Sequence, residues 1–132
     1  MNRAQLNITL SSSERAALDL AIRKAEQLCR AEFSVFVGHS ECADPHAFAT
    51  SLHNSLVAPS RSILIMVDPN IRAVEVVTGA HVRLTLSDHQ ADLAIATMAA
   101  TFAEGDLVGG LRRGIQQLAD SARPQNTLHA GS

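Results

Sequence analysis

The segment "SILIMVDPNIRAVEVVTG", residues 62–79, constrains the fold of this chain more than any other part of its sequence. Residues 63–67 are apolar without alternation, which is typical of a strand covered on both faces. The letters "DPNI" that follow have Asp and Pro in the order that a type I turn prefers. The returning segment places Arg72 on the same side as two valines and the glutamate between them on the other side. We therefore expect a β-hairpin whose first strand lies inside a sheet.

The preceding residues indicate a parallel crossover into that strand. The segment "FSVFVG" is short, rich in Phe and Val and closed by a glycine, which favours a strand. A helix is expected over 44–56, because Asp44 is a preferred cap and Pro45 suits the first helical position. Since a strand–helix–strand unit joins parallel strands, the strand at 63–67 should lie between the strand at 33–37 and the second strand of the hairpin.

Two further helices are marked by their first residues. Ser11 and Glu14 have the spacing of a capping box, in which each side chain bonds the backbone N–H of the other residue. Ser87 and Gln90 have the same spacing. The helix that follows Ser87 is apolar over most of its surface, which favours a central position among the helices.

The last helix, expected over residues 106–123, contains the glycine-rich stretch "EGDLVGGLRRG". Gly110 and Gly114 fall on its apolar stripe one turn apart, whereas the two arginines between them point away. Each interior glycine costs about 1 kcal/mol relative to alanine, and close approach to a neighbouring element is the natural compensation. A phosphate cradle is the alternative, but Asp106 is placed to cap the N–H groups that a phosphate needs. We interpret these two glycines as packing notches, and the pattern leaves Gly109 unexplained.

Length and composition fit one folded domain. The chain has 132 residues, of which 46% are hydrophobic, and this is enough for a substantial core. The element order predicts an α/β fold: a small mixed β-sheet, with one parallel crossover plus an antiparallel hairpin, packed with helices. We expect a single domain over 1–123 and a flexible C-terminal tail over 124–132.

The same composition argues against several partners and compartments. A formal net charge of −2 with 18% charged residues carries no basic footprint, so neither nucleic acid nor a membrane is expected as a partner. No apolar run approaches the ~20 residues of a membrane span, and the amino end lacks the apolar core of a signal peptide. We therefore expect a cytoplasmic protein in which Cys29 and Cys42 are free thiols, with a disulfide between them as the minor alternative.

The ordered set of motifs resembles the TPM domain, a family named for thylakoid, bacterial and nematode proteins. The hairpin segment is similar to the family's apolar strand, charged turn and return strand ending in glycine. The segment "LTLSDHQADLAIATMAATFAEGDLVGGLRRGIQQL" is similar to its helix start, its Phe and Gly-Asp, and its glycine-bearing final helix. The resemblance runs from "FSVFVG" to the last helix, is closer to an uncharacterised actinobacterial branch, and implies a TPM-like sandwich.

The resemblance also implies a range of activities. Members are described as acid phosphatases, as calcium-binding proteins, or as assembly and repair factors without known catalysis. Asp88, Gly79 and Asp106 match the family's aspartate at the helix start, its glycine at the strand end and its Gly-Asp. The family's acidic stretch before the central strand is replaced here by "APSRSI", which carries Arg61 and no carboxylate. Because calcium takes six to eight oxygens, usually from several carboxylates, this replacement argues against a calcium site.

One end of the expected sheet collects seven polar or small residues: Glu32, Arg61, Thr78, Gly79, His81, Arg83 and Asp88. Among them, Arg61, Gly79, His81 and Asp88 are the candidate ligand-binding residues of a small anion pocket. The alternative is that Asp88 favours a helix N-terminus and the other side chains are solvated. A metal, if one binds, would use Asp88 and Asp106, with His81 as a further ligand.

The opposite end, where the parallel strands finish, is the place where open α/β sheets bind ligands. His39, Ser40 and Asp68 fall there, and a His–Asp pair could act as a general base with its orienter. Ordinary loop residues, with Asp68 starting its turn, are the alternative. His46 and His53 are two helical turns apart, too far for one metal, and are expected on the surface.

No complete catalytic set emerges, so no catalytic residue is assigned. The sequence favours a non-enzymatic protein-interaction or assembly module without a cofactor, whose protein partner is unidentified. The alternative is a metal-dependent hydrolase similar to an acid phosphatase, with a divalent cation such as calcium as its cofactor.

Overall fold

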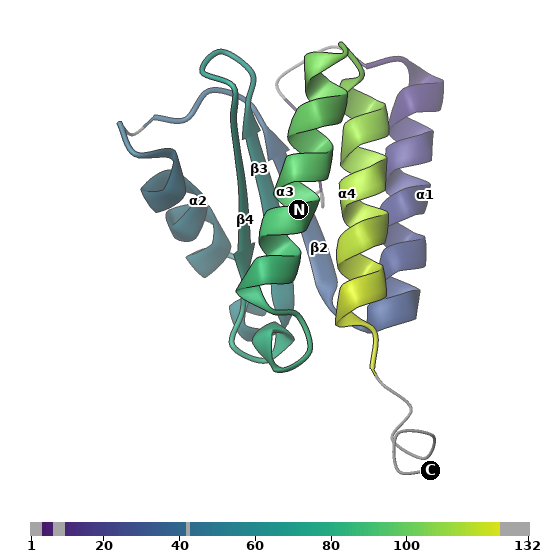
Figure 1. Cartoon of the computed structure of the whole chain (residues 1–132), viewed down its shortest axis with the longest axis vertical. Coiled ribbons are helices and arrows are strands. Elements are labelled where there is room, and N and C mark those ends of the chain that lie inside the picture. Colours follow the sequence, from purple (N-terminus) through teal and green to yellow (C-terminus); the bar gives the residue numbers. More distant parts are fainter. Residues whose placement is uncertain (1–3, 7–9, 42, 125–132) are drawn as a thin grey trace.

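The computed structural model describes residues 4–6, 10–41 and 43–124, which form a four-stranded sheet with helices on both faces (Figure 1). The strands are β1 (Ala4–Leu6), β2 (Glu32–Val37), β3 (Ser62–Asp68) and β4 (Ala73–Thr78). They lie in the order β1-β2-β3-β4; β1, β2 and β3 are parallel, and β4 is antiparallel to β3. The expected α/β fold, with its parallel crossover and antiparallel hairpin, is confirmed.

The helices of the described residues form two layers. They are α1 (Ser12–Cys29), α2 (Pro45–Asn54), α3 (Asp88–Ala103) and α4 (Leu107–Ala122), with short 3-10 helices η1 (Pro59–Arg61) and η2 (Val82–Leu84). Helix α2 covers one face of the sheet, and α1, α4 and α3 lie side by side on the other (Figure 1). Each α-helix starts at a side chain that accepts a backbone N–H from its first turn, as expected: Ser11, Asp44, Ser87 and Asp106.

Strand β3 is the centre of the sheet. All seven of its residues are buried, because β2 and β4 flank it and helices cover both faces. On the larger side its side chains join a core shared with α1, α3 and α4, whereas Leu64 and Met66 face α2. The expectation that the apolar run lies inside the sheet is therefore confirmed.

Strand β1 was not anticipated from the sequence. Its three residues pair in parallel with residues 35–37 of β2, at the edge of the sheet remote from β4. Three residues are too few to show an alternating pattern, and each of them pairs with a residue 31 positions further along the chain.

The order of the helices on the larger face corrects one expectation. The apolar helix after Ser87 was expected at the centre, but α4 lies between α1 and α3 and packs against both, while α3 is at the margin (Figure 1). Hydropathy could not separate the two helices, because alanine counts as apolar wherever it lies. The central position follows instead from the small residues of α4, which let two neighbours approach.

The glycines of α4 show how that approach is made. Gly110 and Gly114 are buried, and a Cβ atom on them would lie 2.4 Å from the ring of Phe102 and 2.3 Å from the sulfur of Met98, respectively. The packing-notch interpretation is thus confirmed for both positions, with α3 as the neighbour. The three atoms nearest to a Cβ on Gly109 would all belong to the Asp106 carboxylate group, which bonds the Gly109 N–H at 2.8 Å. The cap itself therefore occupies the space beside Gly109.

The hairpin turn differs from the expectation at Arg72. Residues 69–72 form the turn between the paired ends Asp68 and Ala73, and Arg72 has a φ of 54°. A left-handed residue often closes such four-residue loops. Arg72 therefore belongs to the turn and not to the alternating face of β4.

Three smaller expectations can also be placed. His46 is on the surface, but the prediction that His53 is also exposed is wrong: it is 5% exposed, and its Nε2 lies 3.0 Å from the Ser62 carbonyl oxygen. Cys29 is a free, buried thiol as expected. Cys42 and the expected tail beyond Pro124 lie outside the described residues. In the part of the chain that the structure describes, no helix is both long and apolar enough to cross a membrane.

Candidate functional site

The carboxyl edge of the sheet is built around a buried carboxylate. Asp68, the last residue of β3, is 0% exposed. Its Oδ2 accepts the Ser40 N–H at 2.8 Å and the Ser40 hydroxyl at 2.9 Å, and its Oδ1 accepts the Asn70 N–H at 3.0 Å. One side chain thus connects the loop after β2 with the turn after β3.

These contacts set the ionisation of Asp68. The bond from the Ser40 N–H lowers the pKa of the carboxyl below its ordinary value of 3.8, although burial works in the opposite direction. The Ser40 hydroxyl, the Asn70 N–H and the nearby His39 lower the pKa further. Hydrogen bonds to the charged form therefore outweigh desolvation, and the group is an anion in the folded protein.

The geometry brings His39, Ser40 and Asp68 together but does not make them a nucleophilic triad. The Ser40 hydroxyl donates to Asp68 and not to an imidazole. The Nδ1 atom of His39 is 3.6 Å from the carboxylate, beyond hydrogen-bond distance, and its side chain is 70% exposed. In a triad the base must bond the nucleophile and the acid must orient the base; here the acid bonds the serine directly.

The candidate ligand-binding residues lie at the other end of the sheet. Gly79 is buried, its N–H donates to the Ser62 carbonyl, and a Cβ there would lie 2.0 Å from the carbonyl oxygen of Pro59. Glycine is therefore required for the close approach of two backbones. The side chains of Arg61, His81 and Asp88 are exposed, and among the described residues no hydrogen bond or ion pair joins them. Their role in binding stays a prediction.

The two expected metal ligands are far apart. Asp88 is the first residue of α3, and Asp106 follows the end of the same 16-residue helix. At 1.5 Å per residue the helix separates them by about 24 Å, so the structure does not bring them to a common ion. Within the described ranges no cluster of three or more His, Cys, Asp or Glu side chains could hold a metal.

A pocket that was not anticipated opens between the hairpin turn and the C-terminal end of α3. It has a volume of about 520 Å³, within the range of small-ligand sites. It is lined by Val67, Asp68, Pro69, Arg72, Ala73, Val74, Ala99, Phe102, Ala103, Gly105 and Leu107. The lining is mostly apolar, with Arg72 as its one cationic side chain. The sequence signal for this pocket was the apolar surface of α3. That surface was expected to be buried, because α3 was expected at the centre of the helical layer.

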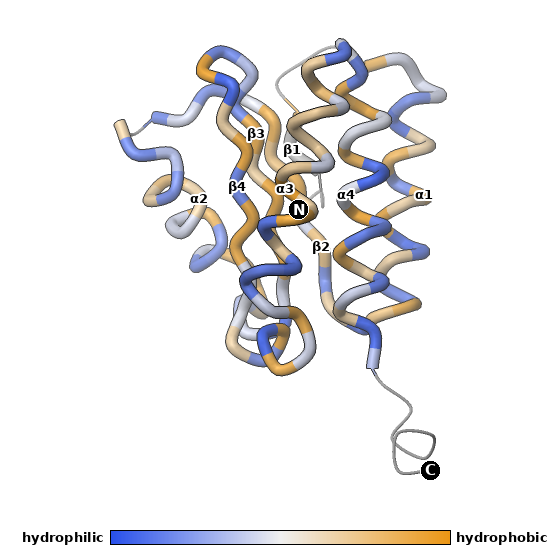
Figure 2. The backbone as a smooth tube through the Cα atoms, in the orientation of Figure 1, coloured by the Kyte–Doolittle hydropathy of each residue, from blue (hydrophilic) through white to orange (hydrophobic). Residues whose placement is uncertain are grey.

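The outer side of α3 continues this apolar surface. We define the α3 face as Leu93, Ala96, Ala99, Ala100 and Ala103, all exposed. Their spacing of three and four residues places them on one side of the helix. Figure 2 shows the upper turns of α3 in pale to orange colours, whereas blue, hydrophilic stretches recur along α1 and α4. Ala99 and Ala103 belong to both the α3 face and the pocket.

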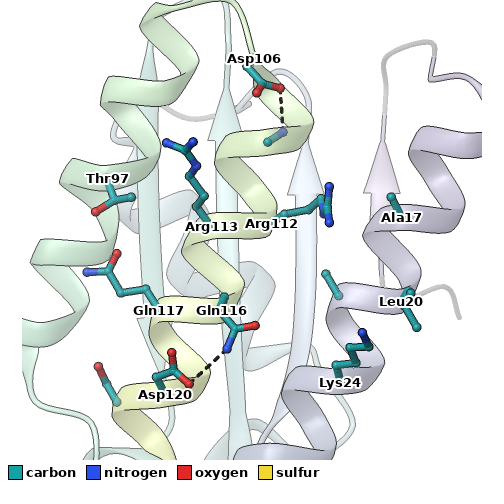
Figure 3. Close-up of a pocket in the computed structure, with 13 residues that line it drawn as sticks. Ala17, Leu20, Lys24, Thr97, Asp106, Arg112, Arg113, Gln116, Gln117 and Asp120 are labelled. Atoms are coloured by element: carbon teal, nitrogen blue, oxygen red, sulfur yellow. Dashed lines mark hydrogen bonds between the residues drawn. The ribbon is translucent and has the colours of Figure 1, made fainter.

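A second, more open depression of about 880 Å³ crosses α4 between α1 and α3 (Figure 3). In it Arg112 points toward α1 and Arg113 toward α3. Asp106 caps α4, and Asp120 accepts from the Gln116 amide at 3.1 Å. Charges of both signs are mixed along this surface, so it favours no single class of ligand.

Comparisons with known proteins give a family and a fold. A family model described as "Domain of unknown function (DUF5130)" matches residues 2–119. Two relatives from Mycobacterium tuberculosis, "Uncharacterized protein Rv2468c" of strain H37Rv and "Uncharacterized protein MT2543" of strain CDC 1551, are each 30% identical over 112 residues. The match covers 85% of this chain and 66% of each relative, slightly less than two thirds of their length.

Three solved solution structures share the fold, each with a TM-score of 0.76. They are the BA42 protein of Bizionia argentinensis, at 21% identity, and the N-terminal domains of a protein from P. gingivalis, at 19%, and of the cg2496 protein of Corynebacterium glutamicum, at 14%. They cover 89%, 90% and 92% of this chain and 84%, 80% and 80% of their own chains, in that order. At these identities the likeness concerns the fold alone.

Proposed function

The chain belongs to this family, the domain of unknown function DUF5130, and from that premise we propose that it is a non-enzymatic protein-association module of the TPM type. We place it in the actinobacterial branch and in the cytoplasm. The ordered motifs described above support the TPM assignment. The compartment rests on the composition of the sequence.

The observation that carries the proposal is the α3 face together with its adjoining pocket. Leu93 is 48% exposed, four exposed alanines continue its side of the helix, and the pocket adds the half-buried Phe102 and Leu107. Contiguous apolar patches bordered by polar residues mark surfaces that bind other proteins. Since α3 is at the margin of its layer, nothing among the described residues covers this side.

The arrangement of the carboxylates, which does not suit a hydrolase, supports the same proposal. The carboxylate of Asp68 is engaged by three hydrogen bonds that connect two loops. Asp88 and Asp106 lie at opposite ends of α3. A generic phosphomonoester such as p-nitrophenyl phosphate is therefore not expected to be hydrolysed. Turnover that disappeared in Asp88→Ala would contradict the proposal.

In-cell photo-crosslinking tests the association directly. A photoreactive phenylalanine is placed at Leu93 or Ala99, and, as a matched control, at Arg23, which is exposed on the far side of the layer on α1. We expect the probes at Leu93 and Ala99 to give discrete adducts of the same mass, each with the same partner protein. The probe at Arg23 should give no adduct of that mass. If the α3 positions give no adduct, or the same adducts as the control, the association function is wrong.

A further inference from the structure

The register of the hairpin shows which backbone groups of β4 face outward. Ile63 pairs with Thr78, so Ser62 and Gly79 are the next opposite positions, and the Gly79 N–H donates to the Ser62 carbonyl. Hydrogen-bonded pairs alternate along an antiparallel ladder, so the odd-numbered residues of β4 bond β3. The N–H and C=O groups of Val74, Val76 and Thr78 consequently point toward the open edge of the sheet.

Most of these outward groups have no partner in the described part of the chain. The Thr78 carbonyl accepts a hydrogen bond from the Arg83 guanidinium. No other strand, turn or side chain among residues 4–6, 10–41 and 43–124 bonds the outward groups of Val74 and Val76, because β4 is the last strand of the sheet. Such an edge is a template for another extended chain.

The pocket lies directly beside this open edge. Val74 lines it, together with Phe102 and Leu107 from the helical layer. In strand addition, the main-chain bonds supply affinity and pockets for alternate side chains supply specificity. A chain paired with Val74 would therefore have an apolar side chain within reach of the pocket.

The charges around the edge indicate what the incoming chain carries. Arg72 precedes β4 and Arg83 follows it, and Arg72 forms no ion pair with any residue that the structure describes. The one carboxylate of β4, Glu75, is on the α2 face, where its Oε1 lies 3.0 Å from Nδ1 of His46. In the described part of the chain, two cations thus bracket the edge. The Asp68 carboxylate also lines the pocket, but its oxygens already accept three hydrogen bonds from Ser40 and Asn70.

These cations argue against a second copy as the occupant. When two β4 strands pair antiparallel, the Arg72 end of one copy meets the Arg83 end of the other, at both ends of the pair. Like charges at an interface suppress such pairings. An extended segment with carboxylates at its ends has the complementary charge.

We propose that the partner binds as an extended segment added to the open edge of β4, with a bulky apolar side chain in the pocket and carboxylates at Arg72 and Arg83. This inference rests on the proposed association function and specifies how the partner is recognised. The α3 face then contacts the part of the partner that continues past the strand.

A nine-residue probe peptide, ELTVTVTLE, tests the recognition in solution, with KLTVTVTLK as its control. For the acidic peptide we expect slowed amide exchange at Val74 and Val76, and an affinity at least about five-fold higher than that of the basic one. Arg72→Gly should abolish this preference while keeping the fold, because glycine accepts the positive φ. Arg30→Gly is the matched control, since Arg30 also has a positive φ, of 61°, at the end of α1. Equal affinities for both peptides, or unprotected Val74 and Val76 amides at saturating peptide, would overturn the proposal.

The cross-linking experiment separates this inference from the function on which it rests. Val76→Pro removes one outward N–H without touching the ladder to β3, which edge strands tolerate. The adduct at Ala99 should be lost in Val76→Pro and in Arg72→Gly and retained in Arg30→Gly. If the adduct persists in both edge variants, association stands and strand addition is wrong. If the unmodified chain gives no adduct, the association function itself fails.

Discussion

At the scale of single residues, Asp68 determines how the carboxyl edge of the sheet is held. Its three hydrogen bonds reach two loops, and each donor would be left unsatisfied in a dry site if the carboxylate were removed. The residue is therefore a structural anchor whose charge matters, in a position where open sheets usually bind ligands.

Asp68→Asn should lower the free energy of unfolding by about 1–3 kcal/mol. The substitution replaces one carboxylate oxygen by an NH₂ group, which cannot accept a hydrogen bond from Ser40 or Asn70. The native carboxyl has a lowered pKa, so the folded state binds its proton more weakly than the unfolded chain. Its stabilisation is complete above the ordinary pKa of 3.8 and is lost as the pH falls through the lower folded-state pKa.

Urea denaturation of the wild type and of Asp68→Asn, at about pH 7 and about pH 3, checks this direction of the pH dependence. The stability gap between wild type and Asp68→Asn should narrow in acid. Asp19→Asn, at an exposed position on α1, is the control. It should leave the free energy of unfolding unchanged at both pH values. A gap that is constant with pH would show that the Asp68 charge contributes nothing.

Cys29 provides a second test at this scale. Burial raises the pKa of its thiol from 9.0, and the side chain is 7% exposed. Since the thiolate is the reactive form, reaction with a thiol reagent should be about ten-fold or more slower in the native protein than in denaturant. The measurement uses Cys42→Ser, so that Cys29 is the sole thiol. Equal rates would mean that the helix end around Cys29 opens freely.

Local rules predicted many of these residue positions, and non-local contacts account for the others. The caps at Ser11 and Ser87 depend on neighbours three positions away, so spacing alone reveals them. His53 is buried because β3 passes beneath α2, and its partner is the carbonyl of Ser62, a contact that no local pattern encodes. The same holds for Asp68, whose position at the turn was anticipated and whose bonds to Ser40 were not.

At the scale of elements, the contact between α3 and α4 controls the helical layer. The glycine notches accept Met98 and Phe102, so that two helices approach more closely than larger side chains allow. Periodicity located the notches on α4 but could not identify which helix fills them. The sequence also could not rank α3 and α4 within the layer, because their order depends on packing against α1.

Gly114→Leu should destabilise the protein by about 1–3 kcal/mol or more, because the new side chain must displace the fully buried Met98. Gly109→Ala is the matched control on the same helix. The atoms nearest to its Cβ belong to the exposed Asp106 side chain, which can shift. A gain in helix propensity of about 0.5–1 kcal/mol then offsets the weakened cap. Thermal melting of both variants measures the difference. If Gly114→Leu has the same melting temperature as the wild type, the close approach of α3 and α4 does not contribute to stability.

At the scale of the whole molecule, the distribution of carboxylates predicts the response to metals. Binding to the folded state alone must raise the melting temperature. With Asp88 and Asp106 at opposite ends of α3, millimolar calcium, magnesium or zinc should shift melting by less than about 1 °C relative to a chelator-treated sample. A saturable rise that is lost in Asp88→Ala would restore the hydrolase alternative.

The central position of α4 also affects the order in which the protein can fold during its synthesis. Among the described elements α4 leaves the ribosome after all the others, yet α1 and α3 both pack on it. Translation proceeds at about 5–20 residues per second, so the apolar stripe of α1 waits several seconds for its neighbour. Until α4 emerges, α1 therefore lacks the helix it packs against most extensively, and a premature stop before residue 107 would leave the sheet with an unfinished core.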